Sequence, residues 1–167
     1  MAMGSCAVDE KVFQAERLER SSTFFVNQPI EQAFELFGPV REKEWAEGWD
    51  PVILFSNGAD VEEHMVFQTP GREGEGNYTW TVTQYQPEAY LIEYTVFTSE
   101  RVWFIRVAGK QHETQTEVTV TYSYTGLTEA GNRRNKVAIE KMFAHDLKDW
   151  EEAINYYIKT GKQLTSL

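Results

Sequence analysis

The chain has 167 residues, one cysteine and a formal net charge of −10, from 26 acidic and 16 basic residues. Its length predicts one domain with a sizeable core, its acidity predicts repulsion of nucleic acid, and the lone Cys6 excludes a disulfide framework and favours the cytoplasm. No apolar run reaches the roughly 20 residues that cross a bilayer, and no secretory signal pattern is present, so we expect no membrane insertion. In chain order, residues 1–15 are expected to be a poorly ordered leader and 16–167 the single domain.

A strand and two short helices are expected first. Residues 16–27 alternate loosely and end in Thr-Phe-Phe-Val, a pattern typical of a strand. Pro29 suits the first turn of a helix, and the apolar residues that follow it recur on one face. These residues are Ile30, Ala33, Phe34 and Phe37. A second helical piece is expected over 40–47, and Trp45 and Trp49 flank the bend that follows.

A meander of five strands is expected next, because short turn sequences separate segments with strand patterns. The expected strands are 59–69, 77–86, 90–98, 101–110 and 114–124, with an extra short strand over 52–55. Connections this short favour antiparallel neighbours. Apolar and polar residues alternate along these strands, so one face is expected to be core and the other solvent.

The alternation of apolar and polar residues along each strand predicts which residues of the meander point inward. The two middle strands are ambiguous, because 102–105 is apolar on both faces, and there the assignment is a choice that leaves Arg106 outward. The predicted inward residues are Tyr78, Trp80, Val82, Ile92, Tyr94, Val96, Trp103, Ile105, Val107, Val118, Val120, Tyr122 and Tyr124.

The last long stretch, 128–160, is predicted to be one continuous amphipathic helix. Its apolar stripe consists of Ile139, Phe143, Leu147, Trp150, Ile154 and Tyr157. Thr128 is expected to cap the start and Gly161 to end the helix in a left-handed conformation.

These elements predict an α+β fold in which a curved antiparallel sheet of six to seven strands wraps around the C-terminal helix. Such a sheet does not close tightly along its length. The gap, bordered by inward aromatic side chains, is the expected binding site.

The sequence also resembles the START-like (SRPBCC) helix-grip superfamily over roughly residues 18–160, and within it the small bacterial polyketide cyclase or dehydrase-like proteins. The segments that carry the resemblance are 29–34, 44–45, 48–51, 66–69, Trp80 with Val82, 85–87, and Tyr122 with 127–132. Members of this superfamily serve as lipid carriers, hormone receptors, aromatases, cyclases or chaperone activators. The resemblance therefore implies the helix-grip fold but does not choose a function.

Several kinds of catalytic site find no support. His64, His112 and His145 are far apart and lack a second ligand at metal spacing, so neither a metal nor another cofactor is expected. No serine lies in a nucleophile elbow, and Cys6 lies in the leader. The Gly-Arg-Glu-Gly-Glu-Gly segment 71–76 lacks the Lys-Ser/Thr ending of a phosphate loop, and its two glutamates repel phosphate; it is better explained as a hairpin loop at the cavity mouth.

Three residues remain as candidate catalytic groups. Glu63 shares the parity of Met65 and Phe67, and an inward carboxylate with a raised pKa could move a proton. The alternative is an edge-strand carboxylate that reaches water. Tyr94 and Tyr122 could orient a ligand through their phenols, or could simply pack in the core.

The expected ligand-binding residues are mainly aromatic: Trp45, Trp49, Phe67, Trp80, Tyr94, Trp103, Tyr122, Phe143 and Leu147. We therefore favour a monomeric or homodimeric binder of a small hydrophobic, aromatic or lipid-like molecule. The alternatives are a cyclase or aromatase that uses Glu63 or a tyrosine, and a module that binds a partner protein through the Thr-rich outer face of the sheet. A desolvated carboxylate beside a polar partner in the interior favours the enzyme, whereas a closed, filled core favours the interaction module.

Overall fold

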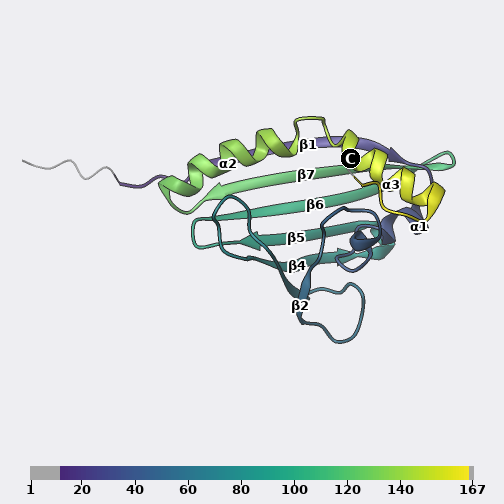
Figure 1. The fold of residues 1–167 in the computed structure, drawn as a ribbon, viewed down its shortest axis with the longest axis horizontal. Helices are drawn as coiled ribbons and strands as arrows, with labels where there is room; N and C mark the ends of the chain where they lie inside the picture. Colours follow the sequence, from purple (N-terminus) through teal and green to yellow (C-terminus); the bar gives the residue numbers. More distant parts are fainter. Residues whose placement is uncertain (1–11, 166–167) are drawn as a thin grey trace, which may run out of the picture.

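A computed structural model describes residues 12–165 and forms a seven-stranded antiparallel sheet in the order β1-β7-β6-β5-β4-β3-β2 (Figure 1). The strands are β1 (Arg17–Val26), β2 (Val52–Phe55), β3 (Val66–Thr69), β4 (Tyr78–Gln86), β5 (Leu91–Phe97), β6 (Arg101–His112) and β7 (Gln115–Gly126). The helices are α1 (Ile30–Glu35), α2 (Glu129–Met142), α3 (Lys148–Thr160) and the short 3-10 helices η1 (Arg41–Glu44) and η2 (Pro87–Ala89). Most of the predicted leader, including Cys6, lies outside the described residues.

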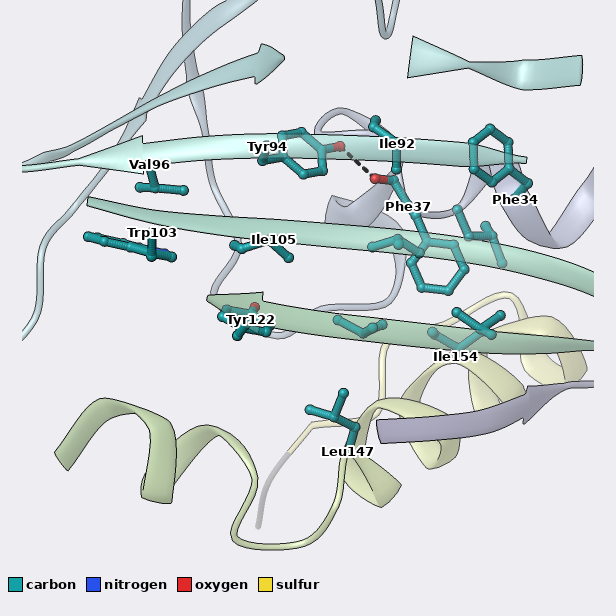
Figure 2. Close-up of a cluster of buried hydrophobic side chains, with 14 of the residues drawn as sticks. Phe34, Phe37, Ile92, Tyr94, Val96, Trp103, Ile105, Tyr122, Leu147 and Ile154 are labelled. Carbon is teal, nitrogen blue, oxygen red and sulfur yellow. Dashed lines mark hydrogen bonds between the residues drawn. The ribbon is translucent and has the colours of Figure 1, made fainter. Parts of the chain in front are cut away.

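The alternating pattern of the strands places one face in the core, as predicted. Every residue assigned inward is buried except Trp80, which is half-buried, and Arg106 is exposed. Figure 2 shows side chains from β5, β6 and β7 on this one face, with residues of the helical segments packed against it. The ambiguous parity of the two middle strands is thereby resolved as expected.

The first strand of the predicted meander is shorter than expected. β3 covers only Val66–Thr69, and residues 59–65 are not a strand. The cause is local, because His64 has a φ of 67°, in the left-handed region that an extended strand excludes. A parity count that runs through His64 is therefore invalid.

The short strand over 52–55 is confirmed as β2, and it forms an edge of the sheet. All four of its residues, Val52–Phe55, are exposed.

Within residues 12–165, no helix combines the length and the apolar character needed to cross a bilayer.

The prediction of one continuous C-terminal helix is wrong. α2 ends at Met142 and α3 begins at Lys148, and both Asp146 and Leu147 between them have positive φ, 49° and 58°. Tertiary contacts hold this break: the Ser22 hydroxyl donates to the Asp146 carbonyl at 2.8 Å, and Leu147 is fully buried.

The predicted ends of the helical region are confirmed. The Thr128 side chain accepts a hydrogen bond from the Gly131 amide at 3.0 Å, and Gly161 follows α3 with a φ of 68°. α2 packs against β7, β1 and β6, whereas α3 contacts β1. The sheet thus holds two helices where one was expected.

Candidate ligand-binding site

The nine predicted ligand-binding residues lie in or next to the core. Seven of them are buried, and Trp49 and Trp80 are half-buried. Trp49, Phe67, Trp80 and Tyr94 form one aromatic group, in which Phe67 stacks on Trp80 with ring centroids 5.5 Å apart and the other rings meet edge to face. The rings therefore contact one another and form a rigid wall.

A second aromatic group follows β6 and β7. The Tyr122 ring stacks on Tyr124 at 5.8 Å and meets Phe143 edge to face at 5.9 Å, and Trp103 lies 5.8 Å from Tyr124. Phe143 and the fully buried Leu147 bracket the helix break, so the break places both side chains over the sheet.

Two tyrosines and an isoleucine form a row across the centre of the inner face. Tyr94 of β5 is opposite Ile105 of β6, which is opposite Tyr122 of β7 (Figure 2). The Tyr94 hydroxyl donates to the Phe37 carbonyl at 2.6 Å. Among the described residues, the Tyr122 hydroxyl has no hydrogen-bond partner, although the residue is only 4% exposed. Tyr122 is thus the phenol of this row that is free to bind another group.

One further residue is relevant to this row, Glu42 of η1, which the sequence analysis did not single out. In a 3-10 helix, side chains three residues apart lie on the same side. Arg41 and Glu44 share one side, where Arg41 Nε donates to Glu44 Oε1 at 2.8 Å. Glu42 shares the other with Trp45, which is buried and donates its indole N–H to the Leu36 carbonyl at 2.8 Å. Glu42 is half-buried, so this spacing indicates that its side chain lies on the side of η1 nearer the core.

The electrostatics agree with that orientation. Burial raises the pKa of Glu42 from 4.5 to about 8. Burial and then the Glu42 carboxylate raise the pKa of Tyr94 well above its ordinary value. The pKa of Tyr122 is also raised well above its ordinary value, by burial first, then by Tyr124 and then by Glu42. The Glu42 carboxyl therefore lies within electrostatic reach of both phenols of the row.

Glu42 has no partner of its own within residues 12–165, since burial alone shifts its pKa and its side chain makes no hydrogen bond or ion pair there. In that part of the chain, the only completely enclosed side-chain polar atom without a partner is Asn135 Nδ2. The Glu42 oxygens and the Tyr122 hydroxyl, which also lack partners, therefore keep some accessible surface. We infer that they face space left between the sheet and the segments covering it.

Of the two alternatives for Glu63, the carboxylate that reaches water is the one found, although residues 59–65 are not a strand. Glu63 is exposed, and its carboxylate accepts a hydrogen bond from the Tyr85 amide at 3.0 Å. The parity shared with Met65 does not apply, because His64 interrupts the extended backbone. The inward carboxylate that the sequence analysis sought is Glu42. Its one local signal was the three-residue spacing to Trp45.

A buried ion pair joins Arg101, at the start of β6, to Glu75. The Arg101 guanidinium contacts the Glu75 carboxylate at 2.8 and 2.5 Å, and their side chains are only 6% and 5% exposed. Glu75 belongs to the glycine-rich loop 71–76, and Tyr78 donates its hydroxyl proton to Glu75 at 2.7 Å. The Arg101 guanidinium also lies 4.6 Å above the Trp103 ring. This network holds the loop on the protein and leaves Glu75 no role as a free acid.

Two concave surfaces lie on the described part of the protein. A pocket of about 270 Å³ opens next to η1, and a groove of about 340 Å³ lies between β1 and α2. The pocket is lined by Phe34, Glu35, Gly38, Arg41, Asp60, Val61, Tyr85 and Ile92. None of the nine predicted ligand-binding residues lines either one. The pocket lies next to η1, because Arg41 lines it and its Gly38 carbonyl accepts the Glu42 amide hydrogen at 2.9 Å.

The histidines take no part in the site. His64, His112 and His145 are all exposed, and the His112 ring packs on Phe25 with centroids 5.4 Å apart. In the described part of the chain, no three His, Cys, Asp or Glu side chains are grouped closely enough to hold a metal ion.

Comparison with known proteins bears on the fold. No protein-family model and no curated protein matches this sequence. Among solved structures, a point mutant of norcoclaurine synthase from Thalictrum flavum with a bound transition state analogue matches with a TM-score of 0.64 at 10% identity, over 89% of this chain and 98% of that one. Ara h 8.0201 matches with a TM-score of 0.57 at 12% identity, over 88% and 99%. A protein from Rhizobium leguminosarum matches with a TM-score of 0.56 at 16% identity, over 86% and 97%.

The chain therefore has the helix-grip fold, with a seven-stranded antiparallel sheet and C-terminal helices packed on it. At these identities the likeness establishes the architecture, and the function has to be argued from the residues.

Proposed function

We propose that the protein binds a small aromatic or other hydrophobic molecule between the sheet and its helical cover, with Glu42 and Tyr122 as the polar contacts. The observation that carries this proposal is the Tyr122 hydroxyl, which is almost fully buried among aromatic side chains and has no hydrogen-bond partner within the described residues; the half-buried Glu42 carboxyl lies within electrostatic reach of it. A buried polar group without a partner is costly, so such a group is retained where something else completes it.

The surroundings of Glu42 favour a ligand that is mostly apolar. Trp45, Tyr94, Ile105 and Tyr122 are all at most 4% exposed. Contact with such walls contributes about 25 cal/mol per Å² of apolar surface removed from water, and one or two polar groups fix the orientation.

A lipophilic fluorescent dye such as 1-anilinonaphthalene-8-sulfonate tests the proposal. We expect saturable dye binding that hydrophobic ligands displace, and we expect Tyr122→Phe to weaken those ligands that carry a hydrogen-bonding group. The control is Tyr156→Phe, since Tyr156 is 39% exposed on α3. The proposal fails if the dye does not bind, or if Tyr122→Phe and Tyr156→Phe behave alike for every ligand tried.

The second candidate function is an enzyme of the cyclase or aromatase type, with Glu42 in the role first assigned to Glu63. The observation in its favour is the raised pKa of Glu42, about 8, which keeps an acid protonated near neutral pH and makes it a competent base above that. A synthase with a bound transition state analogue shares the fold, which makes this candidate plausible only by analogy.

Proton abstraction next to a carbonyl is the step that such an enzyme needs. NMR can follow the exchange of the α-hydrogens of 1-(naphthalen-2-yl)propan-2-one for deuterium. We expect the protein to accelerate exchange with a rate that rises through about pH 8, and we expect Glu42→Gln to abolish the effect. Equal rates with and without protein leave the binder alone as the proposed function.

The outer face gives the interaction module little specific support. Its hydroxyls bond to one another across the strands, as Ser21 does to Thr121 at 2.7 Å and Thr23 to Thr119 at 3.0 Å. The cytoplasmic location, the oligomeric state and the cyclase-like subgroup stay predictions.

A further inference from the structure

We propose that the free edge of β2 is an interface with a second copy of this chain, in which two β2 strands pair antiparallel about a two-fold axis. The two seven-stranded sheets then continue into one another across that axis. The inference goes beyond the proposed function and does not depend on it, because neither Glu42 nor Tyr122 belongs to β2.

The first argument is the exposure of β2. Val52, Ile53, Leu54 and Phe55 are large apolar residues, yet they are 61%, 38%, 55% and 54% exposed. β2 lies at the end of the sheet and pairs only with β3 in the described part of the chain (Figure 1). About half of the N–H and C=O groups of such a strand point away from the sheet. The edge therefore offers both apolar side chains and backbone hydrogen-bonding groups to another strand.

The second argument is the contrast between the two edges of the sheet. β1 forms the other edge and carries Arg17, Glu19 and Arg20, charges of the kind that keep an edge strand from pairing with another chain. Two helices, α2 and α3, also pack against β1. β2 has no charged residue, and no described helix is packed against it to a comparable extent. The protein thus protects one edge and leaves the other suited to pairing.

The third argument identifies the occupant as a second copy. Each copy carries a net charge of −10, so two copies can meet closely only where charge is absent or balanced. Asp50 is the one charged residue between positions 48 and 59, and Lys43 pairs with it at 2.6 Å. Two-fold pairing centred between residues 53 and 54 sets the segment 52–55 against itself in reverse order, so only apolar side chains face one another.

The exposed area sets the expected strength of this dimer. An aromatic side chain buries about 150–250 Å² when it is covered completely, so half-exposed side chains of this size offer on the order of 100 Å² each. The eight side chains of two β2 strands then bury roughly 800 Å², and backbone and flanking contacts bring the total to about 1,000 Å², the low end for a specific interface. The register shift between Ile53 and Phe55 also keeps the new ladder short. We expect a reversible dimer with a Kd of about 10–100 µM.

Sedimentation velocity between about 2 µM and about 500 µM protein measures the association. We expect the weight-average mass to rise from 19.3 kDa toward twice that value. The dimer should be stronger in about 300 mM NaCl than in about 20 mM NaCl, because salt screens the repulsion between two chains of net charge −10. An interface held by ion pairs shows the opposite dependence on salt, and that result would contradict the pairing of uncharged strands.

Leu54→Lys places an ammonium group opposite Ile53 of the second copy, so the Kd should rise at least about tenfold. Val137→Lys is the matched control, because Val137 is 48% exposed on α2 and gains the same charge. A protein that stays monomeric at about 500 µM overturns the inference. A dimer that Leu54→Lys leaves unchanged, or that Val137→Lys weakens equally, also overturns it.

Hydrogen exchange gives a second readout that needs no substitution. At about 500 µM protein, amides of residues 52–55 should exchange about threefold more slowly than at about 2 µM, whereas amides of β1 should keep their rates. A mass that rises without this protection places the interface elsewhere and refutes the role of β2. Dye binding at the proposed ligand site is measured separately, so the failure of either proposal is recognised without the other.

Discussion

Replacing Glu42 with glutamine measures how much the desolvated carboxylate destabilises the folded protein. Its pKa is raised from 4.5 to about 8, so the folded protein holds this proton more tightly than the unfolded chain does. The unfolded chain releases the proton near pH 4.5, and the folded protein therefore loses stability as the pH rises from about 4.5 to about 8. Above pH 8 the loss is complete.

The magnitude follows from that difference in pKa. At ~1.4 kcal/mol per pH unit, the loss is at most about 5 kcal/mol. Glu42 is half-buried and keeps some accessible surface, and water that reaches it lowers this figure. We expect about 2–3 kcal/mol between pH 5 and pH 8.5.

Urea denaturation followed by tryptophan fluorescence measures the effect. Glu42→Gln should stabilise the protein by about 2–3 kcal/mol at pH 8.5 and by less than about 1 kcal/mol at pH 5. Glu152→Gln, which alters an exposed carboxylate, should show no such dependence on pH. A stability difference for Glu42→Gln that is the same at both pH values refutes the inference that this carboxyl is desolvated.

Three further substitutions test the frame around the site. Glu75→Gln leaves Arg101 buried without its ion-pair partner and should cost about 3 kcal/mol in urea; a change below about 1 kcal/mol would mean that water reaches this pair. Thr128→Ala removes the cap that accepts from the Gly131 amide and should cost about 1 kcal/mol, whereas Thr128→Ser should retain most of the stability. Gly131→Ala would place a Cβ 1.9 Å from the Glu100 carbonyl oxygen, so we expect a loss of about 3 kcal/mol in thermal unfolding, and a neutral result would contradict this close approach.

The sequence predicted the sheet well, because alternation is a local signal that burial on one face enforces. Alternation assigned Tyr122 to the inner face, and the choice made for the two ambiguous middle strands put Tyr94 and Ile105 on the same face. Strand pairing then aligned the three in one row. Parity gave no valid assignment for Glu63, because it was counted through a residue with positive φ.

The helix break could not be predicted from periodicity. Phe143, Leu147 and Trp150 keep helical spacing on both sides of it, so the apolar stripe appears unbroken in the sequence. The two residues of positive φ are held by tertiary contacts, since the Asp146 carbonyl accepts from Ser22 of β1. Nothing local to 143–147 specifies that contact.

Glu42 was missed for a related reason. η1 has four residues, too few for a periodic pattern, and Glu42 is one of several glutamates in an acidic stretch. What distinguishes it is the lack of a partner: Glu44 pairs with Arg41, and Glu35 pairs with Arg41 as well. Pairing of this kind is a property of the folded protein and not of the sequence.

α3, which follows the helix break, contacts residues next to Glu42 in the candidate site. Trp150 of α3 packs on Trp45 with ring centroids 5.6 Å apart, and the Tyr157 hydroxyl donates to Glu44. α3 thus contacts Glu44 of η1 and Trp45, the residue that follows η1. α2 packs against β7, β1 and β6, and an unbroken helix continuing along its axis would not turn at 143–147 to meet η1. The inward position of Glu42 therefore depends on the break, and a change that straightens 143–147 should release η1 and expose the carboxyl to water.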